Sequence, residues 1–162
     1  MASIAKGPAS SRDSEPRDAD LEKKIGHILE ELRVVLPGTQ ALLGFQFIAV
    51  FSNTFDALSE AAKALHLLSL ISVCLSTMLL MTPAAYHRIV YDGGESEEFH
   101  KMASGTLLSA MALLSFGVAT ELLVVFSWTT GDSLFAILVA LATFLTFTVS
   151  WFAYPAFKRS RA

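Results

Sequence analysis

The stretch "SLFAILVALATFLTFTVSWFAY", from Ser133 to Tyr154, contains no charged side chain. A helix of a soluble bundle needs a polar face, and the serines and threonines here do not supply one. The stretch is about as long as the roughly 20 residues that a helix needs to cross roughly 30 Å of hydrocarbon. An open strand would leave its backbone groups unpaired in lipid. The stretch therefore predicts a transmembrane helix.

Three further apolar runs precede it, and each holds few polar residues. The run from Val34 to Ser52 contains Gln46, that from Ala64 to Ala85 contains His66, and that from Ala103 to Trp128 contains Glu121. We predict an all-α fold in which four transmembrane helices form an antiparallel bundle. The predicted spans are about 34–53, 64–85, 103–128 and 133–154, and the short "TTGD" at 129–132 makes the last two a hairpin.

The segments around these spans are more polar. Residues 1–19 are predicted to be a disordered cytoplasmic tail, since they offer little apolar surface to bury. Apolar residues at helical spacing predict an amphipathic juxtamembrane helix over 20–36, before a transmembrane domain over 37–157 and a basic cytoplasmic tail over 158–162. Pro37 disfavours helical geometry at Leu36, so we expect a break there. The alternative is that this helix simply extends the first span.

The basic residues predict the orientation. The chain has 12 lysines and arginines. With four spans, both tails and the loop between the second and third spans share one side, and all the basic residues except Lys63 fall on that side. The positive-inside rule then places both termini in the cytoplasm. Between Asp20 and Arg33 acids slightly outnumber bases, so anionic lipid is not an obvious target of that helix.

Two stretches resemble a known family. They are "EELRVVLPGTQALLGFQF" (30–47) and "TPAAYHR" (82–88). They are similar to an uncharacterised bacterial family of small four-span membrane proteins, catalogued as a domain of unknown function. The matching residues are Glu31, Leu32, Arg33, Val34, Gly38 and Gln40 in the first element and Pro83, Ala85, His87 and Arg88 in the second. Thr82 stands where the family most often has alanine. The resemblance implies a bacterial inner-membrane protein and implies no activity.

The polar loop after the second span invites a metal-site interpretation. His87 and His100, with Asp92 and Glu95, are suitable ligand types, but no spacing fixes two of them on one helical face. Haem would need axial histidines at one depth in an apolar pocket. We therefore expect no metal and no cofactor, with His87 and His100 as weak metal candidates. Our preferred interpretation is a cytoplasmic polar clasp between helices, formed by Glu31, Arg33, His87 and Arg88.

The predicted spans contain polar residues that are candidates for a site inside the membrane, among them Gln40, Gln46, Asn53, His66 and Glu121. A carboxyl group facing lipid is costly, so Glu121 should point inward. Counting depth from the middle of each span places Asn53 or Ser69 beside it and His66 one turn further out. Glu121 is then either a structural lock or a proton- or cation-binding group with His66 as its gate.

These features separate the classes of function. No catalytic constellation is visible, so no enzymatic activity is expected, and a net charge of −3 gives no indication of nucleic-acid binding. We expect a non-enzymatic structural or interaction protein whose partners are the lipid bilayer and itself or another membrane protein. The alternative is a small oligomeric transporter or proton- or ion-conducting protein that uses Glu121. Small residues at spacing four, such as Ser72 with Ser76 and Gly105 with Ser109, are expected to form helix-packing faces.

Overall fold

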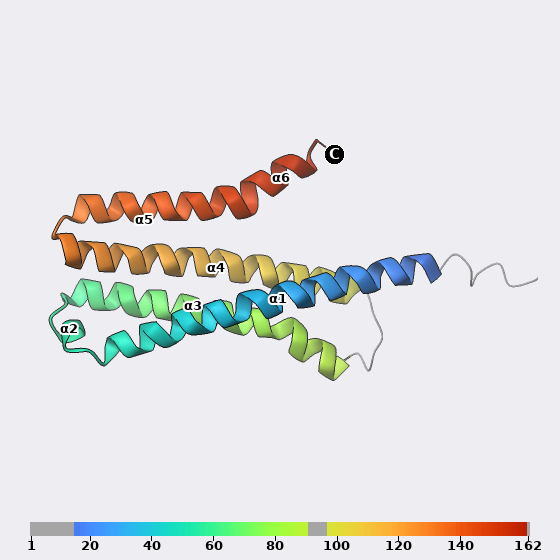
Figure 1. Cartoon of the computed structure of the whole chain (residues 1–162), viewed down its shortest axis with the longest axis horizontal. Coiled ribbons are helices and arrows are strands. Elements are labelled where there is room, and N and C mark those ends of the chain that lie inside the picture. Colours follow the sequence, from blue (N-terminus) through green and yellow to red (C-terminus); the bar gives the residue numbers. More distant parts are fainter. Residues whose placement is uncertain (1–14, 91–96, 162) are drawn as a thin grey trace, which may run out of the picture.

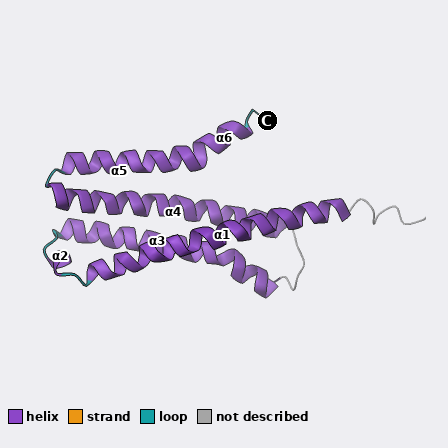
Figure 2. Cartoon of the chain, viewed as in Figure 1, coloured by secondary structure: helices purple, strands orange, loops and turns teal. Residues whose placement is uncertain are grey.

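The computed structural model describes residues 15–90 and 97–161, and these are helical apart from short turns (Figures 1 and 2). The described part of the chain contains no strand. The predicted all-α fold is confirmed. The elements are α1 (Glu15–Val50), α2 (Asn53–Asp56), α3 (Glu60–Val90), α4 (Glu97–Thr130), α5 (Ser133–Thr148), a π-helix η1 (Val149–Ala153) and α6 (Tyr154–Arg159).

Four helical segments are long and apolar enough to cross a membrane, at Gly26–Val50, Glu60–Ile89, Glu97–Thr130 and Ser133–Arg159. They form an antiparallel bundle in which α3 packs on α4, α1 lies across both, and α5 packs on α4 (Figure 1). One end of the bundle carries α2 and the turn between α4 and α5, and we call it the α2 end. The opposite end carries the start of α1 and the end of α6, and we call it the termini end.

The seam between α3 and α4 is closely packed and has a regular period. Its buried residues on α3 are Ser69, Val73, Ser76, Leu80 and Pro83, and those on α4 include Phe99, Ala103, Ala110, Gly117 and Val124. Alternating steps of three and four residues are typical of helices that pack at a small crossing angle. The buried cluster of Leu80, Phe99, Ala103 and Ala110 also includes Ile28 and Leu32 of α1.

Two serines define the register of this seam. The Ser69 hydroxyl donates to the main-chain oxygen of Gly117 at 2.8 Å, and the Ser76 hydroxyl donates to that of Ala110 at 2.7 Å. A step of seven residues forward on α3 thus corresponds to seven residues backward on α4. Such bonds need closely spaced backbones, which small residues permit.

Gly117 is the point of closest approach. A Cβ atom added there would lie 2.8 Å from Val73 Cγ2 and 3.3 Å from the main-chain oxygen of Ser69. By contrast, Gly105 has open space around its missing Cβ, and Ser109 is exposed. Gly105 and Ser109 therefore do not pack within the described chain, because the seam follows the seven-residue series Ala103, Ala110 and Gly117.

The predicted break at Leu36 is also wrong, since α1 is one helix through Pro37. Leu32, Thr39 and Gln46 are buried at 6%, 3% and 3% exposure. They are seven residues apart and share one face, so a continuous helix keeps the whole stripe against its neighbours and outweighs the local preference of the residue before proline. The helix begins at Glu15 and not at residue 20. Residues 1–14 of the expected disordered tail lie outside the described residues.

Local caps explain the turns at the α2 end. The Ser52 hydroxyl accepts from the backbone N–H of Phe55 and caps α2. Gly131 takes a φ of 68°, which favours glycine. Asp132 then caps α5 by accepting from the backbone N–H groups of Leu134 and Phe135 at 2.9 and 3.1 Å. The hairpin expected for 129–132 is confirmed.

At the termini end, the last helix changes its winding before a proline. Pro155 has no N–H to donate, and its ring would crowd the carbonyl of the preceding turn. The chain widens into η1 at Val149–Ala153 and continues as α6, which bends away from the line of α5 (Figure 1). In α4, Glu97 and Glu98 occupy the first turn, where the helix dipole favours acidic residues.

Candidate functional sites at the two ends of the bundle

A buried polar network joins three helices near the α2 end. His66 and Ser69 of α3, Gln46 of α1 and Glu121 of α4 all take part. The His66 side chain is 3% exposed and that of Glu121 is 18% exposed. Glu121 lies nine residues before the last residue of α4, Thr130, so the network is about 13 Å inside the end of that helix at 1.5 Å per residue.

The histidine makes two contacts that define where its protons lie. Its Nε2 lies 3.2 Å from the main-chain oxygen of Gln46, and its Nδ1 lies 2.9 Å from Glu121 Oε1. A main-chain carbonyl only accepts, so Nε2 carries a hydrogen. One further proton is shared between Nδ1 and Oε1, either as an imidazolium–carboxylate pair or as imidazole with a carboxylic acid. In both forms the pair is neutral as a whole.

The glutamine extends this pair to the seam. Gln46 Nε2 donates to Glu121 Oε2 at 3.2 Å and to Ser69 Oγ at 2.6 Å. Ser69 in turn donates to the main-chain oxygen of Gly117. Gln46 Oε1 is buried and has no hydrogen-bond partner among the described residues. The network is thus almost fully satisfied within the chain and keeps one acceptor open.

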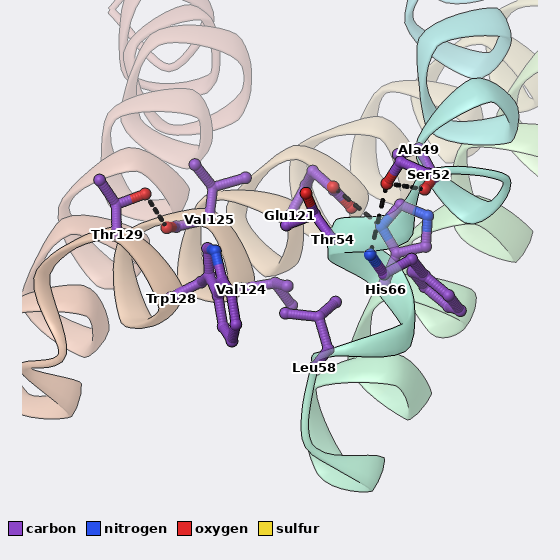
Figure 3. Close-up of a pocket in the computed structure, with 11 residues that line it drawn as sticks. Ala49, Ser52, Thr54, Leu58, His66, Glu121, Val124, Val125, Trp128 and Thr129 are labelled. Carbon is purple, nitrogen blue, oxygen red and sulfur yellow. Dashed lines mark hydrogen bonds and ion pairs between the residues drawn. The ribbon is translucent and has the colours of Figure 1, made fainter.

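A small cavity lies against this pair on its α2 side. Its volume is about 150 Å³, and His66 and Glu121 line it together with the mainly apolar Leu58, Val124, Val125 and Trp128. Figure 3 shows Glu121 and His66 pointing toward each other beside these side chains. Phe55 of α2 also lines the cavity and meets the His66 ring edge-on, with 5.4 Å between ring centroids. The cavity gives Glu121 its limited exposure.

A second and larger cavity lies near the termini end between α1 and α3, which diverge there (Figure 1). Its volume is about 650 Å³. We call it the basic cavity, and its lining residues are Leu29, Leu32, Arg33, Leu36, Leu80, Met81, Ala84, Ala85, His87 and Arg88. No acidic residue of the described part of the chain lines it. Among the ion pairs between described residues, none includes Arg33 or Arg88.

The basic cavity joins the two sequence elements that carry the family resemblance, since Arg33 comes from the first and His87 and Arg88 from the second. The sequence model of a family of unknown function, DUF6328, matches residues 14–155. The chain belongs to this family. The resemblance to an uncharacterised domain family is thereby confirmed. No curated protein and no solved structure matches this sequence.

Within this family member, the four clasp residues are only partly brought together. Arg33, His87 and Arg88 line the basic cavity, but Glu31 lies in a separate groove of α1 with His27 and Glu30. Successive helical residues are about 100° apart, so Glu31 and Arg33 point about 200° apart and cannot both face α3. The His87 ring instead meets Phe99 of α4 edge-on, at 5.3 Å between centroids.

The weak metal candidates do not meet as a ligand set in the described part of the chain. No group of three or more histidine, cysteine or acidic side chains there has the geometry to hold a metal ion. His100 Nδ1 is buried without a hydrogen-bond partner among the described residues. Asp92 and Glu95, which were considered with His87 and His100, lie outside them.

The intramembrane candidates meet in a different pairing from the expected one. Glu121 contacts His66 and Gln46 directly, and it reaches Ser69 only through Gln46. The expected contact with Asn53 is wrong, since α1 ends at Val50 and Asn53 is exposed on α2. His66 is the direct partner of Glu121 and does not lie a turn beyond it. The seven-residue series Ala103, Ala110 and Gly117 is the sequence signal from which the α3–α4 register could have been found.

Proposed function

We propose that this protein is a four-span integral membrane protein of the bacterial inner (plasma) membrane, with both termini in the cytoplasm. Four long apolar helices support the membrane assignment. Lys63 is the one basic residue near the α2 end, and the other described lysines and arginines lie toward the termini end. The positive-inside rule then favours a cytoplasmic termini end.

We further propose that its role is structural or interactive and not enzymatic. The observation that carries this proposal is the polar network of Gln46, His66, Ser69 and Glu121, whose bonds all run between helices of the same chain. Below it, the α3–α4 seam is closed by residues such as Val73, Ser76 and Ala110, each 0% exposed. The interior is thus suited to holding three helices in one arrangement.

The surfaces available for interaction include the outward faces of α1 and α5. Phe45 and Ile48 on α1 are 71% and 67% exposed, and Leu134 and Leu145 on α5 are 67% and 58% exposed. In a bilayer such faces contact lipid, a second copy of the chain or another membrane protein. The size of the complex after mild solubilisation tests this role. A species larger than one chain plus its detergent is expected, and a uniformly monomeric species would contradict it.

A second candidate function is proton or ion binding at Glu121, as part of an oligomeric conductor. Two observations favour it: Glu121 reaches the small cavity at the α2 end, and Gln46 Oε1 beside it is an open acceptor. The closed seam argues against a path through one chain. In liposomes with a proton gradient, we therefore expect no flux above that of Glu121→Gln. Flux that the wild type shows and this variant lacks would favour conduction over the structural role.

The orientation has its own test. A reporter that fluoresces only in the cytoplasm should be active at either terminus, and alkaline phosphatase fused after Asp132 should be active on the opposite side. Phosphatase activity at the termini together with an inactive fusion after Asp132 would reverse the orientation. Release of the chain from membranes by alkaline washing would contradict membrane integration itself.

A further inference from the structure

We propose that the basic cavity binds the headgroup of an anionic phospholipid, with its phosphate on Arg33 and Arg88. The inference rests on the proposed membrane placement and goes beyond the proposed role. It follows from three features of the cavity: the charge of its wall, the chemistry of its floor and its position along the helices.

The charge of the wall is basic, and no described acidic residue lies in the wall. Arg33 and Arg88 approach the cavity from α1 and α3, and His87 lies beside them. The nearest acids on α1, Glu30 and Glu31, line a different groove with His27, and the pair formed by Glu30 is with His27 at 3.9 Å. Two planar guanidinium groups from different helices can each bind a phosphate through paired hydrogen bonds.

The floor of the cavity is apolar. Seven of its ten lining residues are leucine, methionine or alanine, and they include Leu36, Leu80 and Met81. Met81 is 51% exposed, so the cavity reaches the outer surface of α3. A free phosphate would leave this apolar surface unused, whereas the glycerol and upper acyl chain of a lipid would cover it. A volume of about 650 Å³ lies within the roughly 300–1,000 Å³ of small-molecule sites.

The position fits the level of lipid headgroups. Arg88 is in the last turn of α3, and Arg33 precedes the most apolar part of α1. In the proposed orientation this level is the cytoplasmic surface of the membrane, where basic pockets between helices bind anionic headgroups. The described acids of the segment from Asp20 to Arg33, Glu30 and Glu31, do not line the cavity, so the composition of that segment did not reveal this basic face.

Lipid binding to the purified full chain tests the proposal. The protein in dodecyl maltoside micelles is titrated with phosphatidylglycerol or with phosphatidylcholine of the same acyl chains, and bound lipid is counted by native mass spectrometry. Phosphatidylglycerol should bind about 25-fold more tightly, as two charge contacts of about fivefold each would give. Equal binding of the two lipids would overturn the proposal.

Matched variants locate the site. Arg33→Gln and Arg88→Gln should each reduce the preference for phosphatidylglycerol about fivefold. Lys101→Gln, which removes an exposed positive charge of α4 outside the cavity lining, should leave it unchanged. An equal loss in Lys101→Gln would show that the preference is general attraction to the basic end, and the site would be rejected.

Two further measurements complete the test. The first asks whether the bound phosphate belongs to a lipid or to a soluble compound, and the second tests the membrane placement on which the proposal rests. Water-soluble glycerol phosphate should not displace the lipid, because it lacks an acyl chain for the apolar floor. Displacement at similar concentrations would assign the cavity to a soluble phosphate and reject the lipid. If the chain resists alkaline washing of membranes but shows no lipid preference, only the lipid-binding inference is contradicted. If alkaline washing removes the chain from membranes, the proposed membrane placement is contradicted.

Discussion

At the α2 end, His66 Nδ1 lies 2.9 Å from Glu121 Oε1, whereas at the termini end Arg33 and Arg88 line one cavity with no carboxylate from the described residues in its wall. This difference in pairing follows from how deeply the charged side chains are buried. The His66 side chain is 3% exposed, and a charge at such a site must find its partner within the protein. Both arginines are exposed, so water or lipid can supply their partners.

The buried pair also has a role that packing alone does not supply. The series Ala103, Ala110 and Gly117 repeats every seven residues, so α4 would meet α3 with similar small residues after a slip of two turns. The network of Gln46, His66 and Glu121 forms in one register only. We interpret it as a device that specifies the register, as single buried polar residues do in coiled coils.

The largest expected effect comes from removing one partner at the buried end. His66→Leu leaves the Glu121 carboxyl without its imidazole and should lower the free energy of unfolding by about 3–5 kcal/mol. The matched change at the open end, Arg33→Leu, should cost less than about 1 kcal/mol, since no described ion pair is lost. Unfolding in detergent followed by circular dichroism measures both. Equal losses of unfolding free energy in the two variants would contradict the proposed difference between the buried and the open end.

A smaller effect is expected at the helix contact beneath the network. Gly117→Ala forces a methyl group against Val73 and the backbone at Ser69, and overpacking of this kind costs about 1–3 kcal/mol. Gly105→Ala on the same helix meets open space and should stabilise the protein by up to about 1 kcal/mol through helix propensity. Melting temperatures that shift in the same direction for both would show that α3 and α4 are not closely packed at Gly117.

The smallest effect concerns single hydroxyl groups. Ser76→Ala removes a bond to the main-chain oxygen of Ala110 on another helix and should cost about 0.5–1.5 kcal/mol. Ser115→Ala removes a bond to Met111 within its own helix and should cost close to nothing. The same unfolding assay compares the two. A Ser115→Ala variant that is the less stable of the pair would contradict the assigned register.

Much of the fold follows from local sequence patterns. Apolar length predicted the spans, and the short segment at 129–132 predicted the hairpin, because both are local properties of the sequence. Continuity of α1 through Pro37 was not predictable in this way. It depends on the buried stripe of Leu32, Thr39 and Gln46 meeting α3 and α4, which is a property of the assembled bundle.

The sequence identified the residues of the two sites but not which of them contact one another. Glu121, His66 and Gln46 were identified as unusual because polar side chains are rare in such spans, but their pairing depends on register to within one turn. Counting depth from span centres erred because α1 ends at Val50. The predicted polar clasp contained Arg33, His87 and Arg88, which line the basic cavity, but it also contained Glu31, which lies in another groove because neighbouring residues of a helix face different ways.

A double-mutant cycle on His66 and Glu121 tests the account most directly. The free energies of unfolding of His66→Leu, Glu121→Leu and the double variant are compared with that of the wild type in the same detergent. Each single variant leaves one polar group buried without its partner, while the double variant leaves neither. The account predicts that the double variant loses less unfolding free energy than the two single variants lose together, by at least about 1 kcal/mol. Additivity within about 0.3–0.5 kcal/mol would show that the two side chains do not meet and would contradict the account.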